Sequence, residues 1–220
     1  MIKLPNTIGA AWDAYKTLAG GYDIPFLKFE GVPRVIDIGA NAGAFCMWAK
    51  QKWPGCPIRA FEPQPEMWPY FYANTDGQVA LVQKAVWPES PVELFTKKKN
   101  GLLTGPVKYG YHDGESIKVE AVHPNTLPEC EILKVDTEGG EIPILKHYRY
   151  KPSVILVEAH CETDRQKIEK MLNTDYEWVL GELWIRGYCE MKFVRRDHLP
   201  VGGNMSIGGY TEVDPVEIGG

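Results

Sequence analysis

The 220-residue sequence lacks the paired cysteines, long apolar runs and basic character that mark several large classes of protein. Its five cysteines are scattered and form no C-x-x-C pair, which argues against a disulfide framework or a zinc site and favours a reducing compartment. No apolar run reaches the about 18 residues of a membrane span, and the first residues do not resemble a signal peptide. The net charge of -5 gives no general reason to expect nucleic acid. We therefore expect a cytoplasmic protein with no membrane segment.

An apolar content of 44% is ordinary for a folded domain, and the length suits one α/β domain. We predict a single domain over residues 1–220. Residues 1–31 would form an N-terminal helix, from Ile8 to Leu18, and a lead-in. Residues 32–195 would form the core. The Gly-rich tail, 196–220, lacks a periodic pattern, and we expect it to be loop or to pack against another subunit in a homo-oligomer.

The stretch from Arg34 to Lys50 has the pattern of a strand, a glycine loop and a helix. Gly39, Asn41 and Gly43 form the loop, where glycine lets a ligand lie against bare main chain and the helix start offers unpaired N–H groups. Asp37 lies inside the strand, and a buried carboxylate needs a partner, either the loop backbone or an ammonium group of the ligand. The spacing differs from the G-x-G-x-x-G of dinucleotide binders, which argues against NAD. A plain strand-to-helix turn is the alternative.

A second predicted strand, Ile58 to Phe61, ends in Glu62, which follows the glycine loop by about 20 residues. In doubly wound folds an acid at this distance accepts hydrogen bonds from ribose hydroxyls, so Glu62 is the candidate ribose ligand. The alternative is an exposed strand-end carboxylate. Pro65 suits a first helical position, and we predict the second helix over Glu66 to Asn74.

A third strand is predicted from Val79 to Val82, running on through Lys84 to Val86. Ala85, near its end, would border an adenine ring. Two further predicted strands, Val92 to Phe95 and Ile117 to Val122, indicate an inserted hairpin or loop near the mouth of the site.

Acidic residues follow the next two predicted strands. Ile132 to Val135 is followed by Asp136 and Glu138, and the carboxyl ends of strands in an open α/β sheet border one crevice. Glu138 and Glu141 could instead cap the helix that follows. Val154 to Val157 is followed by Glu158 and His160, which point to the same side of an extended chain. This pair suits general-base chemistry, with the acid orienting the imidazole, although a structural histidine is an equal alternative.

The last part of the core is predicted as a helix and two strands. The helix extends from Thr163, a plausible cap, to Leu172, with Ile168 and Met171 on its apolar side. The strands, Tyr176 to Leu180 and Met191 to Val194, would form an antiparallel pair at one edge of the sheet.

Three stretches together resemble the FkbM family of S-adenosylmethionine-dependent methyltransferases: VIDIGANAGAF at 35–45, AFEPQPE at 60–66 and ILKVDTEGGEIPIL at 132–145. VILVEAH at 154–160 extends the likeness. The resemblance implies a Rossmann-like class I methyltransferase fold, with a seven-stranded, mostly parallel sheet, helices on both faces and an antiparallel last strand.

The resemblance also implies roles for single residues. Those that match the first cofactor motif, which holds the amino-acid end of S-adenosylmethionine, are Asp37, Gly39, Asn41 and Gly43, with Phe45 closing the stretch. Glu62 matches the acid on the ribose, Ala85 lies where adenine contacts occur, and Asp136 lies beside the reactive methyl.

From these observations we predict methyl transfer from S-adenosylmethionine to a hydroxyl of a small molecule or saccharide. The candidate base is His160 or Asp136, with Glu138 and Glu158 orienting the acceptor or the base. We assign no metal ligand, although metal-assisted O-methylation through Asp136, Glu138 and His160 is a second interpretation. A third is a non-catalytic subunit that binds S-adenosylmethionine. Nucleic acid is not the expected acceptor.

Overall fold

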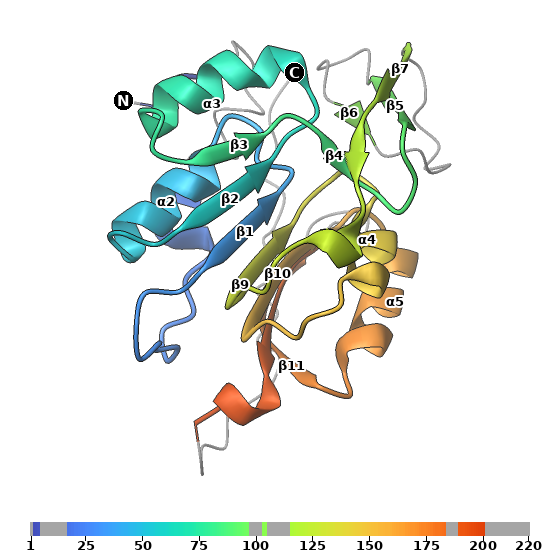
Figure 1. Cartoon of the computed structure of the whole chain (residues 1–220). Coiled ribbons are helices and arrows are strands. Elements are labelled where there is room, and N and C mark those ends of the chain that lie inside the picture. The colour runs from blue at the N-terminus through green and yellow to red at the C-terminus, as the bar shows by residue number, and fades with distance from the viewer. Residues whose placement is uncertain (1, 5–16, 97–102, 105–114, 184–188, 201–220) are drawn as a thin grey trace, which may run out of the picture.

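The computed structural model describes residues 2–4, 17–96, 103–104, 115–183 and 189–200, and its centre is a seven-stranded sheet (Figure 1). The strand order is β11-β12-β10-β9-β1-β2-β3. The strands are β1 (Val35–Ile38), β2 (Ile58–Phe61), β3 (Ala80–Val82), β9 (Ile132–Val135), β10 (Val154–Ala159), β11 (Tyr176–Leu183) and β12 (Cys189–Arg195).

The pairing of the strands confirms the predicted topology. β3, β2, β1, β9 and β10 pair in parallel, whereas β12, the last strand, pairs antiparallel with both β10 and β11. All four residues of β1 and of β9 are buried, as central parallel strands must be when helices cover both faces. The β-branched and apolar runs that predicted these strands are the residues that fill this core.

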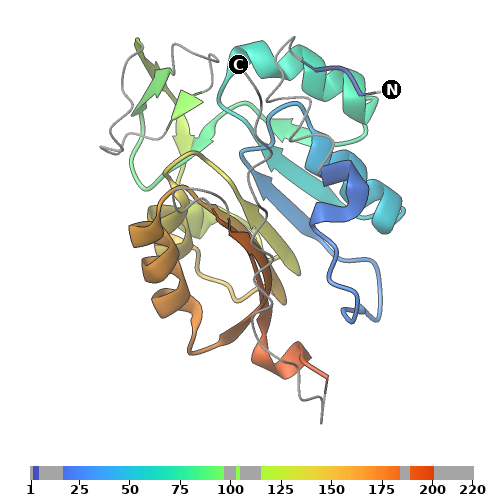
Figure 2. The same ribbon diagram turned by 180° about the vertical axis from the view of Figure 1, so that it is seen from behind.

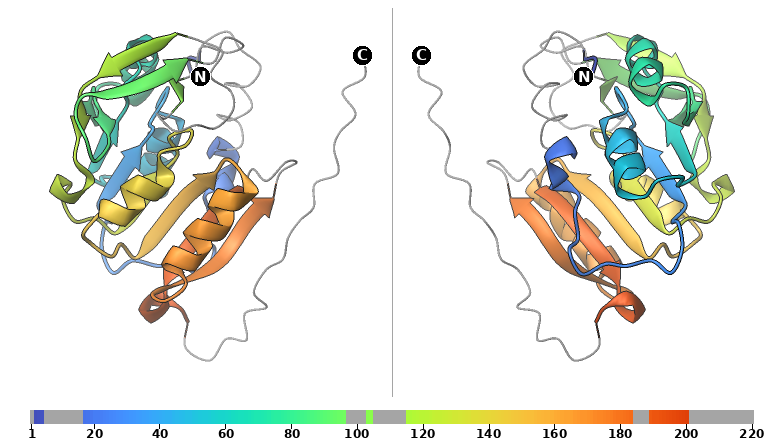
Figure 3. Two further views of the ribbon diagram at one scale, coloured as in Figure 1. Left: turned by 90° about the vertical axis from the view of Figure 1, so that its right-hand side faces the viewer. Right: turned by 90° about the vertical axis from the view of Figure 1, so that its left-hand side faces the viewer.

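Helices cover the two faces of the sheet (Figure 3). On one face, α2 (Ala44–Lys52) and α3 (Trp68–Thr75) pack through Trp48 and Phe71 against alternate strand residues. On the other, α4 (Glu141–His147) and α5 (Glu162–Leu172) pack through Ile144 and Ile168. The short helix η1 (Thr17–Gly21) lies beside α2, as the view from behind in Figure 2 shows. Within the described part of the chain, no helix has the length and apolarity needed to cross a membrane.

Within the described residues, two small sheets and three short helical turns complete the fold. One sheet pairs β4 (Ala85–Val86) with β8 (Ala121–Val122), and the other has the order β6-β5-β7, with β5 (Val92–Thr96), β6 (Leu103–Thr104) and β7 (Ser116–Val119). The antiparallel β5–β7 pair lies in the predicted insertion, but the predicted strand Ile117 to Val122 is divided, because β7 ends at Val119 and Ala121–Val122 pair with β4 in the other sheet. The β5–β7 pair lies on the side of the main sheet toward which β1 and β2 point (Figure 1). The turns are η2 (Pro65–Met67), η3 (Pro124–Thr126) and η5 (Arg196–His198).

Two further local predictions are wrong. The third strand does not run on through Val86: Lys84 N–H donates to Val82 O at 2.9 Å, so the chain turns, and β4 leaves the main sheet to pair with β8. The last helix begins at Glu162 and not after a Thr163 cap, because Cys161 is the residue before its first turn. The predicted N-terminal helix falls mostly on residues 5–16, and most of the tail on 201–220, outside the described residues.

Candidate active site

The loop between β1 and α2 turns at three residues with left-handed backbone: φ is 80° at Gly39, 48° at Asn41 and 85° at Gly43. A Cβ added to Gly39 would lie 1.7 Å from the backbone oxygen of Asp136, so only glycine fits between β1 and the end of β9. Gly43 precedes α2, and no side chain caps this helix start. The N–H groups of residues 39–43 already donate to acceptors within the protein, so the main-chain donors that this turn presents to a ligand are those of the uncapped first turn of α2.

Glu62 closes the other side of this loop. Its Oε2 accepts the N–H of Asn41 at 2.8 Å and its Oε1 accepts the N–H of Gln64 at 2.8 Å. The residue is only 6% exposed, and burial raises the pKa of its carboxyl to about 7 although both hydrogen bonds act to lower it. Because each carboxylate oxygen has a second lone pair, Glu62 keeps the capacity to accept hydroxyl donors while it holds the loop.

A buried lysine connects the loop with the end of β9. Lys134 lies beside Asp37 in the β1–β9 register, and its Nζ is 3.2 Å from Asp37 Oδ1, 3.4 Å from Asp136 Oδ2 and 2.9 Å from the Gly39 oxygen. Burial acts to lower the pKa of Lys134, but Asp37 and Asp136 raise it above its usual range. The ammonium is therefore charged, and Asp37, which is fully buried, has its counter-ion inside the protein.

Lys134 has no predicted role, although the sequence holds a signal for it. A lysine within an apolar strand such as ILKV is almost never buried without an anionic partner. Asp37 stands in the other central strand and has the same requirement. Pairing the two buried charges would have indicated the contact, and would have favoured the loop-anchoring role of Asp37 over direct contact with a ligand.

His160 follows β10 and is held by carboxylates. Its Nε2 lies 3.4 Å from Glu138 Oε2 and its Nδ1 lies 3.7 Å from Glu141 Oε1. Burial lowers the pKa of the imidazole, but Glu141, Glu138 and Glu158 together raise it, to about 9. At neutral pH the ring is thus mainly protonated, and only the minority of molecules with a neutral ring can accept a proton.

The loop after β9 bends so that Glu138 faces His160. Glu138 has φ 57°, a left-handed conformation that side chains rarely adopt. Glu141 holds the loop, since its Oε1 accepts the N–H and the hydroxyl of Thr137 at 2.8 and 3.0 Å, and its carboxylate also accepts the N–H of Gly139. Glu141 stands in the first turn of α4, where an acid suits the helix dipole, but it does not cap the helix as the sequence allowed, because its hydrogen bonds go to the preceding loop.

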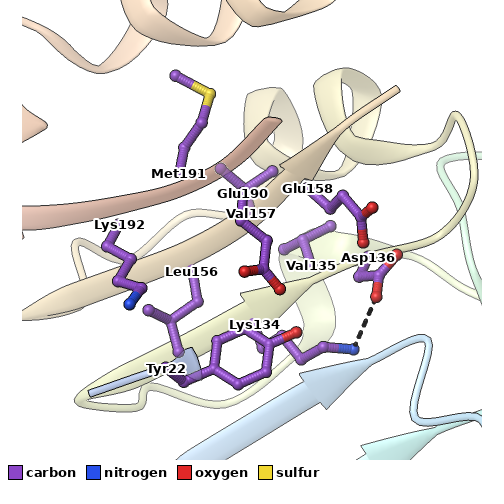
Figure 4. A pocket seen from close by; sticks show the side chains of 10 residues that line it. All are labelled: Tyr22, Lys134, Val135, Asp136, Leu156, Val157, Glu158, Glu190, Met191 and Lys192. Carbon is purple, nitrogen blue, oxygen red and sulfur yellow. Dashed lines mark ion pairs between the residues drawn. The ribbon is translucent and has the colours of Figure 1, made fainter. Parts of the chain in front are cut away.

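A pocket lies between Tyr22, the carboxyl ends of β9 and β10 and the amino end of β12, and Figure 4 shows carboxylates from three elements converging in it. Glu158 is paired with Glu190 in the β10–β12 register, and like charges directly opposite one another destabilise a sheet. Burial, Glu190, Asp136 and Glu158 raise the pKa of the Tyr22 hydroxyl, in that order. Lys134 and Lys192 line the same pocket, so its lining holds three carboxylates and two amino groups. Sequence reasoning missed Glu190, because only the register brings it here.

Of the other candidate residues, Phe45 lies beside this pocket and Ala85 lies outside the main sheet. Phe45 packs edge-on against Tyr22, with the ring centroids 5.0 Å apart, and the Lys134 ammonium is 5.9 Å from its ring. Ala85 is buried in β4, outside the main sheet, and its N–H donates to the Glu120 oxygen at 3.0 Å. Both residues thus have structural contacts of their own.

Known proteins share this sequence pattern and fold. The chain is 24% identical to methyltransferase sdnD of Sordaria araneosa, over 69% of this chain and 75% of that protein. It is also 24% identical to hexuronic acid methyltransferase AglP of Haloferax volcanii, over 66% of this chain and 68% of that protein. The fold resembles Aeropyrum pernix fibrillarin with bound S-adenosyl-L-methionine, with a TM-score of 0.50 and 10% identity over 83% and 76% of the two chains.

The model of the Methyltransferase FkbM domain matches residues 37–188. This region begins at Asp37, contains the glycine loop, Glu62 and the strand ends with Asp136 and His160, and spans well over half of the chain. The protein therefore belongs to the FkbM family of methyltransferases, whose methyl donor is S-adenosylmethionine.

Proposed function

We propose that the protein transfers a methyl group from S-adenosylmethionine to an oxygen atom of a small molecule or saccharide. The observation that carries the proposal is the position of Asp136. Its carboxylate is 3.4 Å from Lys134, which also contacts the glycine loop, and it lies within 4.8 Å of ligand atoms of Glu158 and His160. The cofactor loop and the acid–base groups are thus parts of one site.

The residues present fit this cofactor. Glu62 has acceptor capacity for ribose hydroxyls, and Asp136, Glu158 and Glu190 supply negative charge that complements a sulfonium and an ammonium group. When bound, S-adenosylmethionine supplies an electrophilic methyl on sulfur. We expect the glycine loop to lie against its amino-acid end and Glu62 against its sugar.

The remaining task of the protein is to orient the acceptor and to remove its hydroxyl proton. Asp136 and His160 are the two candidate bases, and Glu138, 3.4 Å from His160, orients the ring. The ligand atom of Glu158 lies within 4.8 Å of those of Asp136 and His160, and we expect Glu158 to accept a hydrogen bond from the acceptor. The name of the relative AglP supports a saccharide, because the nucleophilic atoms of a hexuronic acid are oxygens.

The test is a methyltransferase assay with S-adenosylmethionine and a panel of sugars, uronic acids, phenols and RNA. We expect an O-methylated product whose formation falls about 100-fold in D136N and H160Q, and by a smaller factor in E138Q and E158Q. The matched control is E30Q, which changes an exposed acid before β1. An N- or C-methylated product, or native turnover in all four variants, would contradict the proposal. Tight cofactor binding without turnover on any acceptor would favour a non-catalytic subunit.

Metal-assisted O-methylation is the second candidate. Asp136, Glu158 and His160 each offer one ligand atom, and these atoms lie within 4.8 Å of one another, so the set differs from the predicted one by Glu158 in place of Glu138. Two carboxylates and an imidazole suit a divalent ion that would lower the pKa of an acceptor hydroxyl. Loss of turnover on dialysis against EDTA, with recovery on adding Mg²⁺ or Mn²⁺, supports this route. Full turnover after chelation excludes it.

A further inference from the structure

We propose that Lys134 is a positioning residue for methyl transfer, because its ammonium fixes the Gly39 carbonyl and the Asp136 carboxylate relative to each other. The inference rests on the proposed function, since it concerns how the cofactor loop is held against the residue beside the transferred methyl. Lys134 itself is too deeply buried to touch an acceptor: its side chain is 6% exposed.

The main chain of Gly39, where the glycine loop begins, is held on two sides. Its N–H donates to the Phe61 oxygen of β2 at 3.0 Å, and its carbonyl accepts from Lys134 Nζ at 2.9 Å. The Ala40 N–H donates to the same Phe61 oxygen. Without the lysine, the carbonyl would lose its charged donor at the residue where the main chain leaves β1. The direction of the loop therefore depends on Lys134 as well as on β2.

The Lys134 ammonium also contacts two carboxylates. Asp37 and Asp136 lie 3.2 and 3.4 Å from the same nitrogen, one fully buried and the other 26% exposed at its side chain. Asp37 also accepts from Cys46 Sγ at 3.2 Å, so its orientation is fixed from α2. An ammonium with a fixed partner on one side holds the second carboxylate in a defined place. Asp37 thus acts on the site through Lys134.

A simpler alternative is that Lys134 only neutralises the buried charge of Asp37. The double variant D37N/K134M distinguishes the two explanations, because it removes both charges and keeps an unbranched side chain of similar length at position 134. The single variant K134M leaves Asp37 buried with no counter-ion and is expected to fold poorly. Charge neutralisation alone predicts that the double variant behaves like the native protein.

The measurements are hydrogen–deuterium exchange over residues 39–43, calorimetry with S-adenosylmethionine, and turnover. In D37N/K134M we expect exchange in this loop to rise at least 10-fold while β12 keeps native protection, cofactor affinity to fall about 10-fold, and kcat to fall more than affinity because Asp136 loses its orientation as well. The control is I168A, on the buried face of α5, where a general loss of stability raises exchange evenly over the sheet.

Native loop protection together with native cofactor affinity in D37N/K134M would overturn the inference. Loss of protection in the loop and in β12 alike would also overturn it, because that result describes general unfolding. If the native protein does not bind S-adenosylmethionine, the proposed function fails, and the exchange data still decide whether Lys134 holds the loop.

Discussion

The backbone N–H of Asn41 donates to Oε2 of Glu62 at 2.8 Å, which joins the glycine loop after β1 to the end of β2. The carboxylate that we expect to bind the ribose therefore also fixes the loop that we expect to hold the amino-acid end of the cofactor. Two binding elements that are distant in the sequence are in this way one unit. A change at Glu62 should affect both.

E62Q should weaken S-adenosylmethionine binding at least 10-fold. The amide places an NH₂ group where the carboxylate accepts a backbone N–H from Asn41 or Gln64, so one of the two hydrogen bonds becomes unfavourable. Calorimetry with the cofactor measures the effect. E66Q is the matched control, because Glu66 is exposed and is expected to keep native affinity. Equal affinities of E62Q and E66Q for S-adenosylmethionine would show that Glu62 does not contribute to cofactor binding.

Cofactor binding should also depend on pH through Glu62. Burial raises the pKa of this carboxyl from 4.5 to about 7, so half of the folded molecules carry a neutral Glu62 near pH 7. Because the folded state keeps this proton longer than the unfolded state does, the free energy of unfolding falls as the pH rises from about 4.5 to about 7. Ribose hydroxyls donate to the ionised form. We therefore expect affinity to increase about 10-fold from pH 6 to pH 8, with proton release in calorimetry, and a flat profile for E62Q. An affinity of the native protein for the cofactor that does not change between pH 6 and pH 8 would refute this role of Glu62.

G39A should abolish cofactor binding and strongly destabilise the protein. The new Cβ would lie 1.7 Å from the Asp136 oxygen, and the backbone there has φ 80°. G55A is the matched control, because Gly55 has φ 83° and an added Cβ meets nothing within 4 Å. Strain alone should cost G55A about 1–2 kcal/mol in thermal or urea unfolding. A similar loss of stability in G39A and G55A would show that β1 and the end of β9 can move apart to make room for the Cβ at position 39.

The charge on His160 should make stability fall in alkali. Its pKa rises from 6.5 to about 9 on folding, against the effect of burial, through Glu141 and Glu138. A raised pKa contributes stability that is complete below pH 6.5 and is lost as the pH rises through about 9, at most about 3 kcal/mol. Urea unfolding at pH 6.5 and pH 9.5 should show this loss in the native protein and not in H160Q. If His160 is the base, turnover should also increase up to about pH 9.

E138Q should lower the pKa of His160, because it removes one of the carboxylates that stabilise the imidazolium. An NMR titration of the ring measures this shift, and the turnover profile should move to lower pH with it. The variant E138G distinguishes the effect of the carboxylate charge from that of backbone strain. It removes the same carboxylate, but glycine adopts φ 57° without strain. We expect both variants to have the same lowered pKa and E138G to be the more stable of the two. An unchanged pKa in both would mean that Glu138 does not act on His160.

The short apolar strands were predictable because they carry their information locally. Val35 to Ile38 and Ile132 to Val135 are β-branched or apolar runs bounded by turn residues, and both form central strands. The extension of the third strand was not predictable. Val79 to Val86 reads as one strand, but a turn at Lys84 and pairing with Ala121–Val122, far along the chain, divide it.

The sequence by itself determined the fold, the glycine loop and the acids at the strand ends, because spacing along the chain places these residues at one edge of a parallel sheet. Only the tertiary structure decided which charges meet. It paired Lys134 with Asp37 and Asp136, placed Glu190 opposite Glu158, and turned Glu138 toward His160. These contacts depend on register and on a left-handed turn, which join residues from separate strands and leave no periodic signal in the chain.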